Sequence, residues 1–314
     1  MPASRSALRL AASTLVVALA PCVFNGTPYP TTIQAPAAGG VTNGTAGPDV
    51  IRGSNAADII QGLGDDDVIC GRGGADRLLG DDGNDRLTGD SNTDRIEGGP
   101  GENDIFGGTQ DDTLVGGDGL DFLGGDDGND YIVGNGDSDT VNGGPGNDRI
   151  YGKAGDDSLD GGAGDDLVSG SDGLDTVNGE DGADTLSGGP GGDTLDGGPG
   201  DDTVLGGDDD DVLSGADGID KLYGEGGVDD LNGGPGDDNV SGGPGADLLA
   251  GGDGDDKIGG STGADTLDGG ADDDRLYGQE DADALTSGDG GDYCSGGTAT
   301  DTADATCETQ LGIP

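Results

Sequence analysis

One aliphatic side chain recurs at every ninth residue over most of the chain, with polar or small residues on both sides of it. The column runs from Ile51 to Leu285 and continues through Cys294 and Ala303. A polar, aliphatic, polar triplet is typical of a short β-strand whose middle side chain points into the protein. The period therefore predicts a repeat with one strand of three residues in each nine-residue unit.

Two further columns keep the same phase. A frame G-G-x-G-x-D-x-U-x, in which U is aliphatic, runs without insertion or deletion from Gly44 to Asp304 and contains 29 units. The first position is Gly in 28 units, with Ser287 as the exception, and the sixth is Asp in 28, with Asn103 as the exception. Glycine at positions 1, 2 and 4 is expected to supply the positive φ of a tight turn. Proline at position 3 of some units, such as Pro145, fits a turn and excludes a helix.

A three-residue strand cannot bury its side chain alone, so the units must stack on one another. If each unit is a turn and a strand, two units close one coil of 18 residues, and successive coils lie about 4.8 Å apart. Twenty-nine units then form about fourteen and a half coils and a rod roughly 70 Å long at that spacing. The frame therefore predicts an all-β solenoid with parallel strands, whose core is a thin double layer of aliphatic rows.

Composition adds an electrostatic condition to this fold. The formal net charge is −54, only 3% of residues are aromatic, and six of the 66 acidic residues are Glu, so the rest are Asp. Stacking places position-6 carboxylates about 5 Å apart, where two unit charges repel by roughly 3 kcal/mol at an effective dielectric near 20. One buried aliphatic side chain per unit supplies only about 1.5–3 kcal/mol before chain entropy is counted. The rod therefore requires divalent cations, and an all-oxygen ligand set favours Ca²⁺ over Zn²⁺.

These columns resemble the RTX, or haemolysin-type, calcium-binding nonapeptide repeat, and the resemblance covers residues 44–304. It implies a right-handed parallel β-roll with Ca²⁺ between the turns of units n and n+2. It also implies that the position-6 Asp is the carboxylate ligand and that turn carbonyls complete the shell. Carried over by position, the most regular turns give these candidate metal ligands: Asp112, Asp121, Asp130, Asp148, Asp157, Asp166, Asp175, Asp184, Asp193, Asp202, Asp220, Asp238, Asp247, Asp256 and Asp265.

Some turns depart from the pattern of the family. Asn103 lacks the charge of the position-6 Asp, and Ala56 and Gln110 replace the glycine at position 4. The first few units also lack the second glycine. These departures put the corresponding sites in doubt.

The ends of the chain predict export. Residues 1–20 read as a signal peptide, with a weakly basic start, an apolar run too short to span a bilayer, and an A-x-A pattern at 18–20. A lipid anchor on Cys22 is an alternative. Residues 21–43, rich in Pro, Thr, Ala and Gly, are expected to be a linker, and residues 305–314 a C-terminal cap. We therefore expect a secreted, extracellular protein.

The four cysteines fall into two groups. Cys294 occupies an inward position 8 and Cys307 follows the last unit, so a disulfide between them is expected to close the end of the solenoid. Cys70 lies at position 9 and is expected to face outward. It either pairs with Cys22 or remains a free thiol.

Catalytic functions fit this sequence poorly. It has no histidine, which removes the common zinc motifs and the Ser-His and Cys-His nucleophile pairs. With twelve Lys and Arg against 66 acidic residues, nucleic acid is not an expected partner. We expect a calcium-binding protein without a catalytic domain that folds when Ca²⁺ binds.

The alternative function is a cell-surface adhesin or a structural spacer of the extracellular matrix, with a partner that the sequence does not identify. Four apolar residues at turn position 5 are expected to be exposed and are candidate contacts for such a partner, although apolar residues are often simply tolerated on a surface: Leu120, Leu174, Ile219 and Val228. Ice binding is disfavoured, because positions 3 and 5 do not form uniform rows of Thr or Asn.

Overall fold

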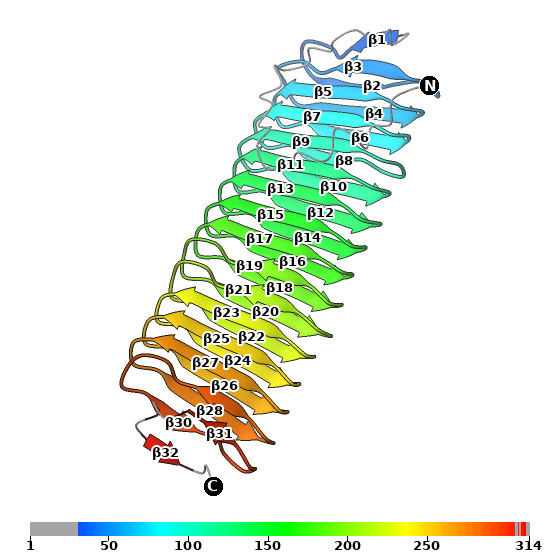
Figure 1. Ribbon diagram of the computed structural model, residues 1–314. Helices are drawn as coiled ribbons and strands as arrows, with labels where there is room; N and C mark the ends of the chain where they lie inside the picture. Colours follow the sequence, from blue (N-terminus) through cyan, green and yellow to red (C-terminus); the bar gives the residue numbers. More distant parts are fainter. Residues whose placement is uncertain (1–30, 305–306, 308, 312–314) are drawn as a thin grey trace, which may run out of the picture.

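The computed structural model describes residues 31–304, 307 and 309–311, and every regular element among them is a β-strand. The strands form two parallel sheets of 16 strands each, and the chain alternates between the sheets. Figure 1 shows the result as a straight stack of coils, with β1 at one end and β32 at the other. The predicted all-β parallel solenoid is confirmed.

The first sheet holds the odd-numbered strands in chain order. They are β1 (Thr31–Gln34), β3 (Asp49–Arg52), β5 (Val68–Gly73), β7 (Arg86–Ser91), β9 (Asp104–Thr109), β11 (Phe122–Asp127), β13 (Thr140–Pro145), β15 (Ser158–Ala163), β17 (Thr176–Asp181), β19 (Thr194–Asp196), β21 (Val212–Ser214), β23 (Asp230–Pro235), β25 (Leu248–Asp253), β27 (Thr266–Ala271), β29 (Ala284–Thr286) and β31 (Thr302–Ala303).

The second sheet holds the even-numbered strands. They are β2 (Gly40–Asn43), β4 (Asp58–Gly64), β6 (Arg77–Asp82), β8 (Arg95–Glu97), β10 (Thr113–Asp118), β12 (Tyr131–Gly136), β14 (Arg149–Ala154), β16 (Leu167–Asp172), β18 (Thr185–Pro190), β20 (Thr203–Asp208), β22 (Lys221–Gly226), β24 (Asn239–Pro244), β26 (Lys257–Thr262), β28 (Arg275–Glu280), β30 (Tyr293–Ser295) and β32 (Thr309–Leu311).

The register confirms the 18-residue coil. In the pairing of β10 with β12, Leu114 lies opposite Ile132, one coil later in the chain. Most strands, however, have six residues rather than the predicted three, because they continue through positions 1 to 3 of the next unit. The strand continues through position 1 because the glycine there does not have the positive φ that would turn the chain.

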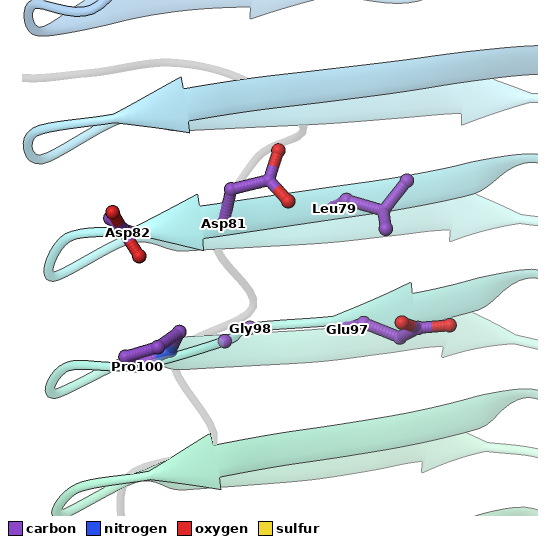
Figure 2. Close-up of a pocket in the computed structure, with 7 residues that line it drawn as sticks. Leu79, Asp81, Asp82, Glu97, Gly98 and Pro100 are labelled. Atoms are coloured by element: carbon purple, nitrogen blue, oxygen red, sulfur yellow. The ribbon is translucent and has the colours of Figure 1, made fainter.

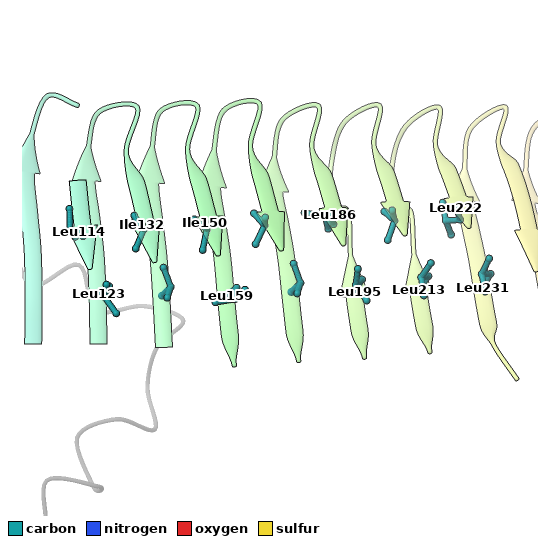
Figure 3. Close-up of a cluster of buried hydrophobic side chains, with 14 of the residues drawn as sticks. Leu114, Leu123, Ile132, Ile150, Leu159, Leu186, Leu195, Leu213, Leu222 and Leu231 are labelled. Carbon is teal, nitrogen blue, oxygen red and sulfur yellow. The ribbon is translucent and has the colours of Figure 1, made fainter. Parts of the chain in front are cut away.

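The core consists almost entirely of the position-8 side chains. Those from Ile51 to Cys294 are at most 2% exposed. Figure 3 shows them as two facing rows, one from each sheet, with Leu114 and Ile132 in one row and Leu123 and Leu159 in the other. Each residue fills the space between the sheets and contacts its row neighbours one coil away, so the core is continuous but only two side chains thick.

The solenoid begins before the nonapeptide frame does. The predicted linker 21–43 is wrong for its described part, because β1 and β2 pair in parallel with β3 and β4. Ile33 lies opposite Ile51 and packs against the core. A strand needs its backbone ladder and one inward apolar side chain, and Ile33 stands in phase, 18 residues before Ile51, without the Gly and Asp columns. Residues 1–30, which include the predicted signal peptide and Cys22, lie outside the described residues.

The cysteines lie at the two ends of the rod. A disulfide joins Cys294 of β30 to Cys307, with their Cα atoms 5.8 Å apart. The expectation that Cys70 faces solvent is wrong: it is fully buried, and it is not a free thiol. Val50 and Val68, which point outward from β3 and β5, are also buried. The outer face of the first sheet is therefore covered at this end, whereas it is open further along.

Candidate metal centre

The position-1 glycines are required for space and not for backbone conformation. None of them has a positive φ, which corrects the expectation from the sequence. A Cβ at Gly224 would contact Oδ2 of Asp229 in its own unit and would lie 2.7 Å from the carbonyl oxygen of Gly242 in the next coil. In most units the corresponding carboxylate and carbonyl oxygens lie close to the point where a Cβ at position 1 would be. Position 1 therefore opens a small space lined by a carboxylate oxygen and a carbonyl oxygen.

The turn conformation comes from positions 2 and 4. From Leu63 onward, every position-2 residue has a positive φ, including non-glycines such as Lys153 and Glu180. Most position-4 residues share this conformation, and Asp65 and Asp137 adopt it where glycine is missing. Asp and Asn tolerate left-handed backbone better than other non-glycine residues. The turns are therefore alike despite their variable sequences.

The position-6 side chains form a continuous ladder on each edge of the rod. All of them are buried, at no more than 4% exposure. From Asp67 onward, Oδ1 accepts a hydrogen bond from the backbone N–H of the position-6 residue one coil earlier, as Asp166 does from Asp148 at 2.7 Å. This contact occurs 27 times among the described residues, twice with Asn103 as one partner. We call the space between the turns of two successive coils on one edge of the rod an inter-turn gap.

The second carboxylate oxygen of these residues has no partner. Oδ2 is buried and makes no hydrogen bond in 26 of the position-6 aspartates, from Asp67 to Asp301. A buried polar atom without a partner costs about 1–3 kcal/mol, and a charged one costs more. In most inter-turn gaps this oxygen and a carbonyl oxygen of the next coil face the same position-1 glycine. The gap therefore presents only oxygen acceptors, which fits Ca²⁺ and offers nothing to a nitrogen- or sulfur-preferring metal.

Few carboxylate side chains line each gap. Among the described residues, no three His, Cys, Asp or Glu side chains converge on one point. A cation in a gap would be held by Asp side chains of two adjacent turns, with backbone carbonyls supplying the other ligands. This set agrees with the carboxylate and carbonyl shell that the family resemblance implies.

All fifteen predicted ligands lie in this arrangement. The structure also places in the ladder these position-6 residues that the prediction left out: Asp67, Asp76, Asp85, Asp94, Asp139, Asp211, Asp229, Asp274, Asp283, Asp292 and Asp301. Most of these lie in units with an irregular turn sequence. Their turns adopt the same backbone conformation, so Asp at position 6 is enough to place a residue in the ladder, whatever the rest of the turn sequence.

A second ladder at position 5 was not predicted. Here the backbone N–H donates to a side chain one coil earlier, as Asn129 does to Asp111 at 2.9 Å and Ile219 to Asp201 at 3.0 Å. These residues are exposed, as are the apolar ones in the same column, Leu120 and Leu174 among them. Where position 5 is Asp or Asn, its side chain thus ties neighbouring turns together on the solvent side of the gap.

Burial raises the pKa of most position-6 carboxyls. Loss of surrounding water, the largest cause, raises the pKa of Asp112 and Asp139 from 3.8 to about 8, and neighbouring carboxylates add to the effect. The backbone N–H that each carboxyl accepts acts in the opposite direction. Asp85 and Asp202 shift to about 7 for the same reason. A charged row is thus unfavourable in this site unless a cation compensates it.

Acidification of metal-free protein is expected to favour the folded rod. A carboxyl with a raised pKa binds its proton more tightly in the folded than in the unfolded chain, so its contribution is fully present below pH 3.8. That contribution is lost as the pH rises through about 6 to 8. Circular dichroism in chelator-treated buffer at pH 4 and pH 8 checks this. Equal spectra would contradict it, and calcium affinity is expected to fall at acid pH because protons compete for the ligands.

Figure 2 shows a pocket on the second sheet at β6 and β8. Its lining residues are Leu79, Asp81, Asp82, Glu97, Gly98, Gly99 and Pro100. Glu97 accepts hydrogen bonds from Arg95 at 2.8 Å and from Arg77 at 3.4 Å, so its charge is already paired. The lining contains no nucleophile with an adjacent base, and this pocket does not indicate catalysis.

No helix among the described residues is long and apolar enough to cross a membrane.

Comparisons with known proteins agree with this site. The profile of the RTX calcium-binding nonapeptide repeat matches in overlapping stretches that together span residues 43–294. A search of curated proteins gives no match. Among solved structures, a hyperactive, Ca²⁺-dependent, β-helical antifreeze protein from an Antarctic bacterium is 20% identical, with 88% of this chain and 86% of that chain covered and a TM-score of 0.33. At that TM-score the likeness carries no argument. The repeat profile, however, covers most of the chain, and the chain therefore belongs to the family of RTX calcium-binding nonapeptide repeats, whose cofactor is Ca²⁺ bound as multiple ions.

Proposed function

We propose that the protein is a secreted, non-catalytic module that folds when Ca²⁺ enters the inter-turn gaps. The observation that carries this proposal is the row of buried Oδ2 atoms without partners, repeated along both edges of the rod. Calcium supplies the positive charge that these oxygens lack, while the chain's own residues fix their positions. The ligands proposed are the position-6 aspartates, including the fifteen predicted from the sequence.

Secretion fits this chemistry. Extracellular calcium sites commonly have dissociation constants of about 10⁻⁴ to 10⁻³ M. A chain with a formal net charge of −54 and ligands spread over many coils would remain unfolded at low calcium. It would then fold where calcium is abundant. The absence of histidine from the sequence supports a role without acid–base or nucleophilic catalysis.

Native mass spectrometry of the chain at increasing calcium is the test. We expect many Ca²⁺ ions per chain, bound cooperatively, and far weaker binding of Mg²⁺, which demands octahedral geometry and keeps its water. Asp220→Asn is expected to remove one ion, because it discharges one gap ligand. Asp217→Asn, in the same turn but exposed, is the matched control and is expected to remove none. A chain that binds no calcium, or loses as much in the control, would refute the proposal.

A structural spacer is the second candidate function. The two 16-stranded sheets run without interruption from β1 to β32, which gives a straight and uniform rod. Exposed Leu174 and Val228, at 61% and 55%, are candidate contacts for a surface or matrix partner. Replacing both by Ser should leave calcium binding unchanged and weaken retention on the producing cell, if this role holds.

A further inference from the structure

Three turns of the position-6 ladder contain a hydrogen-bond donor where the others have only acceptors. In the first unit of the frame, Oδ2 of Asp49 accepts from the backbone N–H of Thr45 at 2.6 Å and from its hydroxyl at 2.9 Å. In the second unit, Ser54 donates in the same way to Asp58, at 2.7 Å and 2.9 Å. The oxygen that lacks a partner in later units is doubly bonded in these two.

The backbone of these two turns differs as well. Thr45 and Ser54 occupy position 2, yet neither has the positive φ that every later position-2 residue adopts. Position 4 also lacks it in both, at Gly47 and Ala56. A Ser or Thr hydroxyl that bonds to a nearby group stabilises its own local turn. The first two units therefore close by a turn of their own type, held by side-chain and backbone donors.

Asn103 produces the third such turn by different chemistry. Its Oδ1 keeps the ladder and accepts from the N–H of Asp85 at 3.0 Å. Its Nδ2 donates to the carbonyl oxygens of Gly99 at 3.1 Å and Gly101 at 3.2 Å. An amide nitrogen thus lies where a position-6 aspartate has its unpartnered Oδ2. It engages turn carbonyls that would otherwise be available to a cation.

We infer that three inter-turn gaps take no calcium. Each lies between the turn that contains Asp49, Asp58 or Asn103 and the turn of the next coil on the same edge. Donor hydrogens carry positive charge into these gaps and occupy the lone pairs that a cation needs. The inference rests on the proposed function and specifies which gaps perform it. Of the 26 aspartates with an unpartnered Oδ2, Asp292 and Asp301 have no later coil of the ladder beyond them, so 24 gaps remain for calcium.

The turns that contain Asp49 and Asp58 lie at the N-terminal end of the nonapeptide frame. Asp49 and Asp58 belong to consecutive units and form the two turns of one coil, next to β1 and β2. That coil is held by its own donors on both edges. In the first coil of the nonapeptide frame Oδ2 is therefore satisfied without an ion, and the calcium-dependent coils can stack on this coil.

Counting the ions bound to full-length variants by native mass spectrometry at saturating calcium tests the inference. Asn103→Asp is expected to bind one ion more than the wild type, because it replaces the amide donor by a carboxylate oxygen. Asn129→Asp makes the same chemical change at the exposed position 5 and is expected to add none. The double variant Thr45→Gly/Ser54→Gly, which restores the regular repeat, is expected to add two.

The outcomes separate the inference from the function on which it rests. A wild type that binds no calcium refutes the proposed function and the inference with it. A wild type that binds calcium, with equal ion counts in Asn103→Asp and Asn129→Asp, overturns the inference alone. Should the glycine double variant fail to fold, the pair of Asn-to-Asp variants still decides between these outcomes.

Discussion

Removal of calcium is expected to abolish the β-sheet circular dichroism of the protein and to expose the chain to proteolysis. Adjacent position-6 carboxylates lie one coil apart, and at about 5 Å they repel by roughly 3 kcal/mol per neighbouring pair at an effective dielectric near 20. The single aliphatic side chain of each unit supplies about 1.5–3 kcal/mol when buried. Each unit also loses backbone entropy of about 1–2 kcal/mol per residue. Without cations, the balance therefore favours the unfolded chain.

The measurement is far-ultraviolet circular dichroism at pH 8 with excess EGTA, followed by addition of excess Ca²⁺. The β spectrum should disappear and return, and Mg²⁺ at the same concentration should not restore it. Sodium chloride at equal ionic strength controls for general screening of charge. A spectrum that EGTA leaves unchanged would mean that the rod is stable as a polyanion, and calcium-dependent folding would be excluded.

Alanine at a position-1 glycine is expected to damage the rod far more than alanine two residues later. At Gly224 the new Cβ would press on Oδ2 of Asp229 and lie 2.7 Å from the carbonyl oxygen of Gly242. Overpacking of this kind costs about 1–3 kcal/mol, and it also displaces both oxygens of one gap. We expect Gly224→Ala to lose one bound ion and to need more calcium to fold.

Gly226 provides the matched control. It lies in the same turn, has no positive φ, and a Cβ there would find its nearest neighbour, the carbonyl oxygen of Gly207, 4.0 Å away. Gly226→Ala should therefore match the wild type in ion count and in the calcium midpoint of folding. If Gly224→Ala and Gly226→Ala bind the same number of ions and fold at the same calcium concentration, the space beside position 1 does not hold a calcium ion.

The fold could be predicted from the sequence because each column has one physical role that does not depend on distant residues. The aliphatic side chain at position 8 must face inward, and a frame without insertions leaves one way to stack it. The beginning of the solenoid was missed because Ile33 keeps the inward role while its neighbours lack the Gly and Asp columns. A single apolar residue in phase is a weak pattern, and only pairing of β1 with β3 reveals it.

The residues of the position-6 ladder were predicted by type but not by geometry. That Asp is the expected ligand follows from its recurrence at position 6. That one of its oxygens is committed to the N–H of the preceding coil does not, because this bond depends on the exact stacking of turns 18 residues apart. The same limit applies to Asn103 and Thr45. The sequence presents Asn103 only as a departure from the repeat, and the structure shows both residues to be donors with partners of their own.

The number of gaps has a consequence for how the protein behaves in solution. Calcium ions in 24 gaps would carry 48 positive charges, against a formal net charge of −54. The loaded chain would keep only about six negative charges, so it should migrate slowly towards the anode, whereas the metal-free chain migrates fast. Proteins near zero net charge lose the mutual repulsion that keeps them dispersed. Calcium would therefore shape the rod and at the same time lower the electrostatic repulsion between one rod and the next.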